Sequence, residues 1–158
     1  MLFRSLKVLG ARIFLGHDGA NVVGMNPASD IVVRSSAVPE SNSEITAARK
    51  EGVPVWERAK FLAALMEGYR SVAVAGTHGK TTTTSMLTVA LQHCRLDPSF
   101  AIGATVRNSG TNAHHGTGDI FIVEADESDG SFTAYKPYGA IITNIELDHV
   151  DNFKEDRK

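Results

Sequence analysis

The sequence has few of the features that mark secreted or membrane proteins. It contains a single cysteine, Cys94, which cannot form an internal disulfide, so a reducing, cytoplasmic setting is the expectation. No apolar run approaches the roughly 20 residues of a membrane-spanning helix. Residues 1–7 lack the apolar region and small-residue cleavage site of a signal peptide. We therefore expect no membrane partner.

The chain also lacks an excess of charge of either sign. It has 16 Lys and Arg against 18 Asp and Glu, which gives a formal net charge of −2. Nucleic-acid-binding proteins neutralise phosphates with clustered basic side chains, so this balance argues against a nucleic-acid partner. Hydrophobic residues make up 42% of the 158 residues, enough for the packed core of an ordinary globular protein.

The most informative segment spans residues 72–84, with the sequence VAVAGTHGKTTTT. A short apolar run ends in a turn bracketed by two glycines, and a helical pattern follows. Glycines let backbone N–H groups approach phosphate oxygens, and a helix N-terminus adds partial positive charge. Residues of this kind are typical of a nucleotide-phosphate loop, and the expected contacts are Gly76, Thr77, His78, Gly79, Lys80, Thr81 and Thr82.

Within this loop, Lys80 can reach the outer phosphates and the hydroxyl of Thr81 can ligate Mg²⁺. The spacing meets the usual Walker pattern only in part, because that pattern has a glycine where Val74 stands. The loop has instead the shorter form Gly-x-x-Gly-Lys-Thr-Thr. The alternative is a Gly/Thr-rich turn before an ordinary helix.

Short apolar runs alternate with helical patterns along the chain. We expect strands at residues 11–15, 30–33, 53–56, from 71 into the loop, 100–103, 120–123 and 140–143, helices at 43–49, 57–66 and from 81 or 82, and an extended loop over 107–118. The last two strands are continuously apolar, which is typical of strands covered on both faces. The pattern predicts an α/β fold with an open, mostly parallel sheet. The best candidate boundary lies near residues 68–71.

Polar clusters follow these last two strands. Glu124 leaves the first strand, and Asn144 and His149 follow the second. Ligand groups collect beyond the carboxyl ends of strands in such sheets, so Glu124 is the best candidate for a Mg²⁺ ligand. His149 could bind a second metal, and Asn144 could contact nucleotide or phosphate. The alternative is that these acidic residues are solvated loop charges.

The loop over 107–118 holds two adjacent histidines, His114 and His115. Adjacent histidines rarely share a metal, because metal-binding pairs have wider spacing. A position in a surface loop explains them more simply, and substrate contact is the alternative. Asn112 in the same loop is open to both explanations.

Taken together, residues 76–82, 124–129 and 143–149 strongly resemble the ATP-binding domain of the Mur ligases. The segment around Ser36 resembles the later part of the family's UDP-sugar-binding domain, and the loop with Asn112 and His114 resembles its substrate-facing loop. The resemblance implies part of a Rossmann-like UDP-sugar-binding domain over residues 1–69. It implies part of the P-loop central domain over residues 70–158.

The resemblance further implies amide bond formation that uses ATP and Mg²⁺ in peptidoglycan synthesis. In the alanine-adding branch of the family, the carboxylate of UDP-N-acetylmuramate would attack the γ-phosphate of ATP, and L-alanine would then displace phosphate from the acyl phosphate. Lys80, with Mg²⁺ on Thr81 and Glu124, would spread charge on the transferred phosphoryl group. By family analogy, His149 would hold the second metal.

Two alternatives share these motifs. One is a relative that attaches a preformed tripeptide in cell-wall recycling, and the other is a non-catalytic ATP-binding module. The Gly-rich turn expected before residue 2 and the amino-acid-binding domain expected after residue 158 are not in the sequence. The expectation is therefore a fragment that cannot ligate alone, and alanine-dependent phosphate release by the purified chain would overturn it.

Overall fold

The structure is a computed structural model that describes residues 6–126 and 131–146 of the chain. It divides into two compact units, Met1–Arg58 and Ala59–Lys158, and each is described by itself. No helix within the described residues is both long enough and apolar enough to cross a membrane.

The first unit is built on two short parallel strands, β1 (Val32–Arg34) and β2 (Val55–Glu57). The unit also contains helix α2 (Ser43–Lys50) and the 3-10 helix η1 (Gly19–Val22). Its hydrophobic core includes Val22, Ala48 and Val53. The side chain of Asn42 accepts a hydrogen bond from the backbone N–H of Glu44 at 2.9 Å. Asn42 therefore caps α2.

The second unit contains a five-stranded sheet in the order β5-β4-β6-β3-β7. Its strands are β3 (Arg70–Ala75), β4 (Ser99–Val106), β5 (Thr111–His114), β6 (Ile120–Glu124) and β7 (Gly139–Ile142). All neighbouring pairs are parallel except β4 and β5, which are antiparallel. The predicted α/β class and the mostly parallel sheet are both confirmed.

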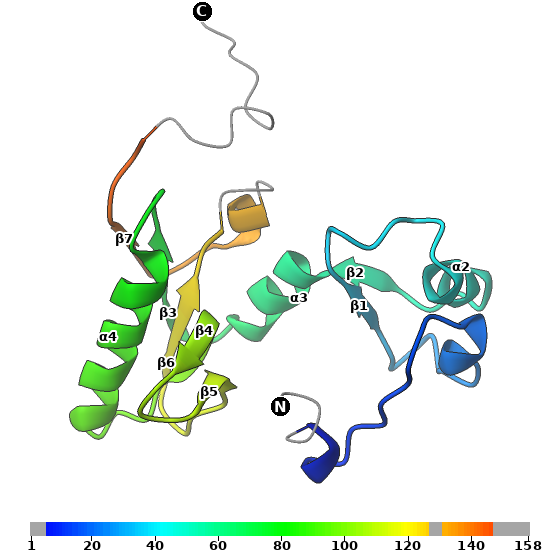
Figure 1. Cartoon of the computed structure of the whole chain (residues 1–158), viewed down its shortest axis with the longest axis horizontal. Coiled ribbons are helices and arrows are strands. Elements are labelled where there is room, and N and C mark those ends of the chain that lie inside the picture. Colours follow the sequence, from blue (N-terminus) through cyan, green and yellow to red (C-terminus); the bar gives the residue numbers. More distant parts are fainter. Residues whose placement is uncertain (1–5, 127–130, 147–158) are drawn as a thin grey trace, which may run out of the picture. The chain divides into compact units, whose positions relative to one another are not determined.

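The two faces of this sheet carry separate cores. Helix α4 (Lys80–His93) covers one face, where its apolar side chains pack with Phe100, Ile102 and Ile122 (Figure 1). Phe121 and Val123 face the other side and pack with residues near α3 (Arg58–Leu65) and η2 (Ser131–Ala134). Alternate residues of a strand point to opposite faces, so a strand covered on both sides is apolar throughout, as β6 is.

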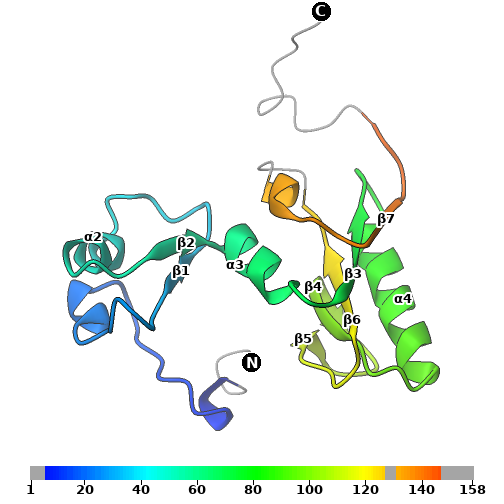
Figure 2. The same ribbon diagram turned by 180° about the vertical axis from the view of Figure 1, so that it is seen from behind.

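Two expectations from the sequence are wrong. Residues 11–15 form no strand, and Leu15 is 96% exposed. A short apolar run becomes a strand only with a partner, and no described strand pairs with this one. The expected loop at 107–118 contains β5 at the edge of the sheet (Figure 2). The remaining expected strands and helices are present with shifted ends.

Candidate functional site

The phosphate-loop segment forms the predicted strand, turn and helix. Strand β3 ends at Ala75, and α4 begins at Lys80. Gly76 and Gly79 adopt φ values of 130° and 81°, which lie in the left-handed region that favours glycine. A side chain on Gly76 would also overlap the hydroxyl of Thr143 and crowd the backbone of Asn144. The first glycine is therefore required both for its φ and for space.

The segment after β7 holds this loop in place. The backbone N–H of Thr143 donates to the carbonyl of Ala75 at 3.0 Å, and its hydroxyl donates to the carbonyl of His78 at 2.6 Å. The backbone N–H of His78 donates to the side-chain oxygen of Asn144 at 2.9 Å. The expected nucleotide contact of Asn144 stays a prediction, while its hydrogen bond fixes the loop backbone.

Lys80 lies across the loop that precedes it. Its Nζ donates to the carbonyls of Gly76 at 2.6 Å and Thr77 at 3.2 Å, and its side chain is half-buried. These bonds bring the ammonium group to the turn bracketed by the two glycines. This is where a cation can neutralise the phosphates of a nucleotide bound on the loop.

Thr81 and Glu124 lie in contact at the carboxyl ends of the parallel strands. The hydroxyl of Thr81 donates to Oε1 of Glu124 at 2.7 Å, although the residues are 43 positions apart. The other carboxylate oxygen, Oε2, accepts the backbone N–H of Gly103 at 2.8 Å. The parallel pairing of β3 with β6 explains the meeting, since it sets Val74 opposite Glu124.

These oxygens fit a magnesium ion. Mg²⁺ prefers hard oxygen ligands, keeps several waters and takes the rest of its shell from one or two protein groups and substrate phosphates. A hydroxyl and a carboxylate oxygen stand 2.7 Å apart beside the loop, so the pair can supply two such ligands. Within residues 6–126 and 131–146, no group of three His, Cys, Asp or Glu could form an all-protein metal cage. His149, the predicted ligand of a second metal, lies outside the described residues.

The comparisons with known proteins decide the family. Two family models match the sequence: "Mur ligase family, catalytic domain" at residues 2–70 and "Mur ligase middle domain" at residues 74–157. The chain belongs to the Mur ligase family. The resemblance drawn from the sequence motifs is thereby confirmed.

Named relatives agree with this assignment. This Mur ligase chain is 57% identical over 94% of its length to a UDP-N-acetylmuramate–L-alanine ligase of Saccharopolyspora erythraea, of which it covers 30%. It is 54% identical over 93% of its length to the enzyme of the same name from Mycobacterium tuberculosis, again covering 30%. The chain thus spans about a third of the length of these relatives.

Solved structures of the family share the fold. A UDP-N-acetylmuramate–alanine ligase from Thermotoga maritima superimposes with a TM-score of 0.82 at 34% identity, over 94% of this chain and 34% of that one. The second structure is a ligase of Neisseria meningitidis that is named for UDP-N-acetylmuramate and L-alanyl-γ-D-glutamyl-meso-diaminopimelate. It superimposes with a TM-score of 0.81 at 30% identity, over 96% of this chain and 52% of that one.

The predicted substrate residues of this Mur ligase chain lie on different elements. Asn112 and His114 are on β5, half-buried and exposed respectively, and Ser36 is exposed in the first unit. Thr82 is exposed in the first turn of α4. Their contacts to substrate or nucleotide stay predictions.

Near Thr81 the second unit has a pocket of about 900 Å³ between α4 and the end of β4. A volume of this size is in the usual range for small-molecule sites. Its wall is mostly apolar, with hydroxyl groups at the end near the phosphate loop and a few polar or charged side chains besides. The lining residues are Thr81, Thr82, Ser85, Met86, Val89, Ala90, His93, Ala104, Thr105, Val106, Arg107 and Asn108.

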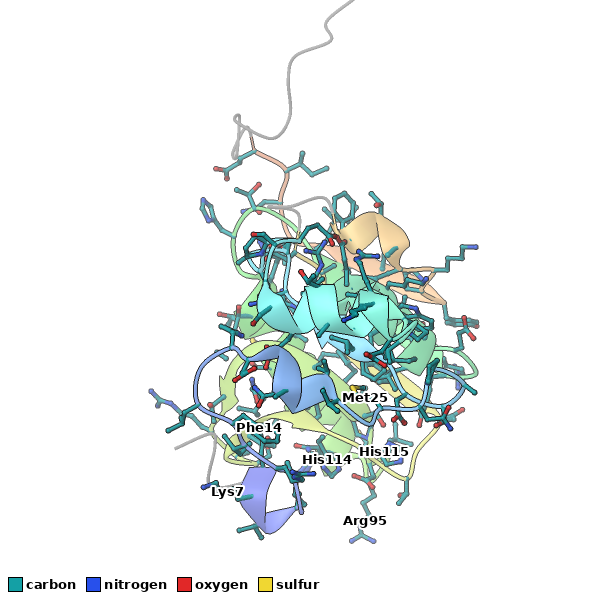
Figure 3. The ribbon with its side chains drawn as sticks, turned by 90° about the vertical axis from the view of Figure 1, so that its right-hand side faces the viewer. Lys7, Phe14, Met25, Arg95, His114 and His115 are labelled. Atoms are coloured by element: carbon teal, nitrogen blue, oxygen red, sulfur yellow. The ribbon has the colours of Figure 1, made fainter. Side chains whose placement is uncertain are left out.

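Asp97, which the sequence analysis did not single out, binds the predicted substrate residue His114 and the segment after β5. Its Oδ2 accepts the backbone N–H of Thr117 at 2.8 Å and the hydroxyl of Thr117 at 2.9 Å, and its Oδ1 lies 3.1 Å from Nε2 of His114. The hydrogen bond from the backbone N–H of Thr117 is the largest cause that lowers the pKa of the Asp97 carboxyl to about 2, and the hydrogen bond with His114 is the second. Asp97 therefore fixes β5 and the turn after it. Figure 3 labels both His114 and Arg95, and the side chain of Arg95 extends away from the ribbon.

This pKa predicts a measurable pH dependence of stability. The folded-state pKa is below the unfolded value of about 3.9. Ionised Asp97 therefore stabilises the fold above about pH 4, and this contribution disappears as the pH falls through about 2. Asp97→Asn should lower the melting temperature at pH 5, and the gap to the wild type should narrow toward pH 2. Asp119→Asn, which alters a long and exposed ion pair with Arg70, is the control. A gap that stays constant from pH 5 to pH 2 would refute the role of Asp97.

Proposed function

We propose that this chain carries the ATP- and Mg²⁺-binding region of a UDP-N-acetylmuramate–L-alanine ligase. The observation that carries the proposal is the contact of Thr81 Oγ1 with Glu124 Oε1 at 2.7 Å, beside Lys80 on a glycine-bracketed loop. A hydroxyl, a carboxylate and an ammonium group gather there, which is what binding a metal–triphosphate complex requires. The relatives at 57% and 54% identity bear the name of this ligase.

The chain's own residues act by positioning and by charge neutralisation. Lys80 exchanges the loop carbonyls that it now contacts for oxygens of the outer phosphates. Backbone N–H groups of the loop and the first turn of α4 bind the remaining phosphate oxygens. Thr81 and Glu124 would hold one Mg²⁺, and His149 would bind a second metal. Bound Mg²⁺ supplies positive charge that lowers the repulsion between two anionic reactants.

The proposed reaction forms an amide in two displacements. A carboxylate oxygen of UDP-N-acetylmuramate attacks the γ-phosphorus of ATP, and the bond to ADP breaks. The amino group of L-alanine then attacks the acyl carbon, loses a proton and expels phosphate. Phosphorylation is needed because a carboxylate oxygen is a poor leaving group.

The pocket beside Thr81 supports an approach for the acceptor sugar. It shares Thr81 with the proposed metal site, so a group held there reaches the outer phosphate from the side of β4. Arg107 on its wall offers positive charge to an anionic acceptor. Asn112, His114 and Ser36 are proposed as further substrate contacts.

We also propose the domain division at residues 1–69 for UDP-sugar binding and 70–158 for ATP binding, and a cytoplasmic location. The family models change at nearly the same place, between residues 70 and 74. The cytoplasm is where reduced Cys94 and a supply of ATP coincide.

A ligase that attaches a tripeptide is the second candidate. It is favoured by the structural similarity to the Neisseria meningitidis ligase, whose TM-score of 0.81 nearly equals the 0.82 of the UDP-N-acetylmuramate–alanine ligase of Thermotoga maritima. The identities of 57% and 54% to alanine ligases favour the first candidate.

The phosphate loop is tested by nucleotide binding to the chain itself. Lys80→Ala removes the ammonium group, so the affinity for Mg·ATP in calorimetry should fall at least tenfold, or about 1.4 kcal/mol. Lys136→Ala removes the same charge from an exposed position in the same unit and should leave the affinity unchanged. Equal affinities for the two variants would show that the loop does not bind the nucleotide.

The ligation activity is tested in a chimera. Residues 1–158 replace the matching segment of the Saccharopolyspora erythraea ligase, and amide formation is followed with L-alanine and with tripeptide. We expect ATP-dependent ligation of L-alanine at a rate within about tenfold of the parent, which is 1.4 kcal/mol in the barrier. No ligation by a folded chimera would contradict the proposal. The chimera takes its amino-acid-binding domain from the parent, so tripeptide serves there as the negative control, and the second candidate is tested by the same comparison on the full-length ligase that contains this chain.

A further inference from the structure

Strand β4 changes its pairing as it approaches the site. Ala101 pairs with Val123 of β6 and with Ala113 of β5, but the next registered pair, Val106 with Thr111, is shifted by a bulge or irregularity. Gly103 lies within this interval. On the other side of β4, toward β6, the last registered pair is Ala101 with Val123, and beyond it the backbone N–H of Gly103 points to the side chain of Glu124.

The contact between Gly103 and Glu124 is close and specific. The N–H of Gly103 donates to Oε2 of Glu124 at 2.8 Å. A Cβ at position 103 would lie 3.1 Å from the same oxygen and 3.5 Å from the carboxyl carbon. The backbone of Gly103 is not in the left-handed region. The constraint on position 103 is therefore space beside the carboxylate.

Both oxygens of the Glu124 carboxylate are engaged. Thr81 donates to Oε1 and Gly103 donates to Oε2. If Oε2 were free, the carboxylate could rotate about its last bond, and ordering it on a metal would cost conformational entropy. A partner that holds one oxygen orients the other, as hydrogen-bonded neighbours of metal ligands generally do.

We propose that Gly103 is a positioning residue for the metal site: it fixes Oε2 of Glu124 so that Oε1 faces Thr81. The inference rests on the proposed function, because it presumes that Thr81 and Glu124 bind Mg²⁺ with ATP. The segment that follows Gly103, from Ala104 to Asn108, lines the 900 Å³ pocket. This end of β4 therefore orients a metal ligand and forms a wall of the pocket beside it.

The test compares two glycine-to-alanine changes in the same sheet. Gly103→Ala places a methyl group against Glu124, whereas Gly139→Ala on β7 meets nothing within 4 Å. ATP affinity is measured by calorimetry with Mg²⁺ and with excess chelator. In Gly103→Ala, the factor by which Mg²⁺ raises the ATP affinity should be about fivefold or more smaller than in the wild type. The ATP affinity without metal should be unchanged. Gly139→Ala should keep the full gain.

The outcomes separate the two proposals. If the wild-type chain binds ATP with no dependence on Mg²⁺, the proposed metal site fails and the positioning role fails with it. If the wild type shows the gain and Gly103→Ala retains as much of it as Gly139→Ala, only the positioning role is overturned.

A folding defect in Gly103→Ala is resolved by a second variant. Glu124→Ala removes the carboxylate that the new methyl group would meet. The proposal predicts that Gly103→Ala lowers the melting temperature in the wild-type background and has no further effect with Glu124→Ala. An equal decrease in both backgrounds would show that alanine disturbs the strand itself, and the proposal would be wrong.

Discussion

The parallel pairing of β3 with β6 is the constraint on which the site depends. It sets Val74 opposite Glu124 and continues one residue further, where the N–H of Ala125 donates to the carbonyl of Val74 at 2.9 Å. Because the carboxyl ends of parallel strands lie on the same side of the sheet, the loop after β3 and the carboxylate at the end of β6 lie next to each other. A register shift of one residue would turn Glu124 to the other face of the sheet.

The neighbouring strands complete the site from either side of this pair. β7 lies beside β3, and the residues that follow it, Thr143 and Asn144, fix the loop through backbone and side-chain hydrogen bonds. β4 lies beside β6, and Gly103 near its end holds the carboxylate of Glu124. The core below is apolar on both faces, so the strand ends are held firmly while their polar groups stay accessible. Such support by rigid elements is what a precise binding site requires.

The sequence predicted the structure best where few residue types other than the one present could serve the same physical role. The glycines, Lys80 and Thr81 predict a strand, turn and helix, and Glu124 after an apolar strand predicts the partner of Thr81; the structure brings them together. β5 was missed because a polar edge strand pairs through its backbone and has no apolar pattern. Residues 11–15 were wrongly expected to form a strand because a run of this length cannot reveal whether a partner exists. Gly103 gave a usable signal, since an isolated glycine within a strand pattern often marks a bulge.

The central claim is that Thr81 and Glu124 share a metal with the phosphates of ATP. The most direct measurement is a crystal structure of the chain with Mn²⁺ and a non-hydrolysable ATP analogue, with the ion located by its anomalous scattering. Our account predicts the ion between Thr81 Oγ1 and Glu124 Oε1, with the direct hydrogen bond between them broken and the bond from Gly103 to Oε2 kept. An ion bound only by phosphates and water, with the hydrogen bond from Thr81 to Glu124 intact, would contradict it.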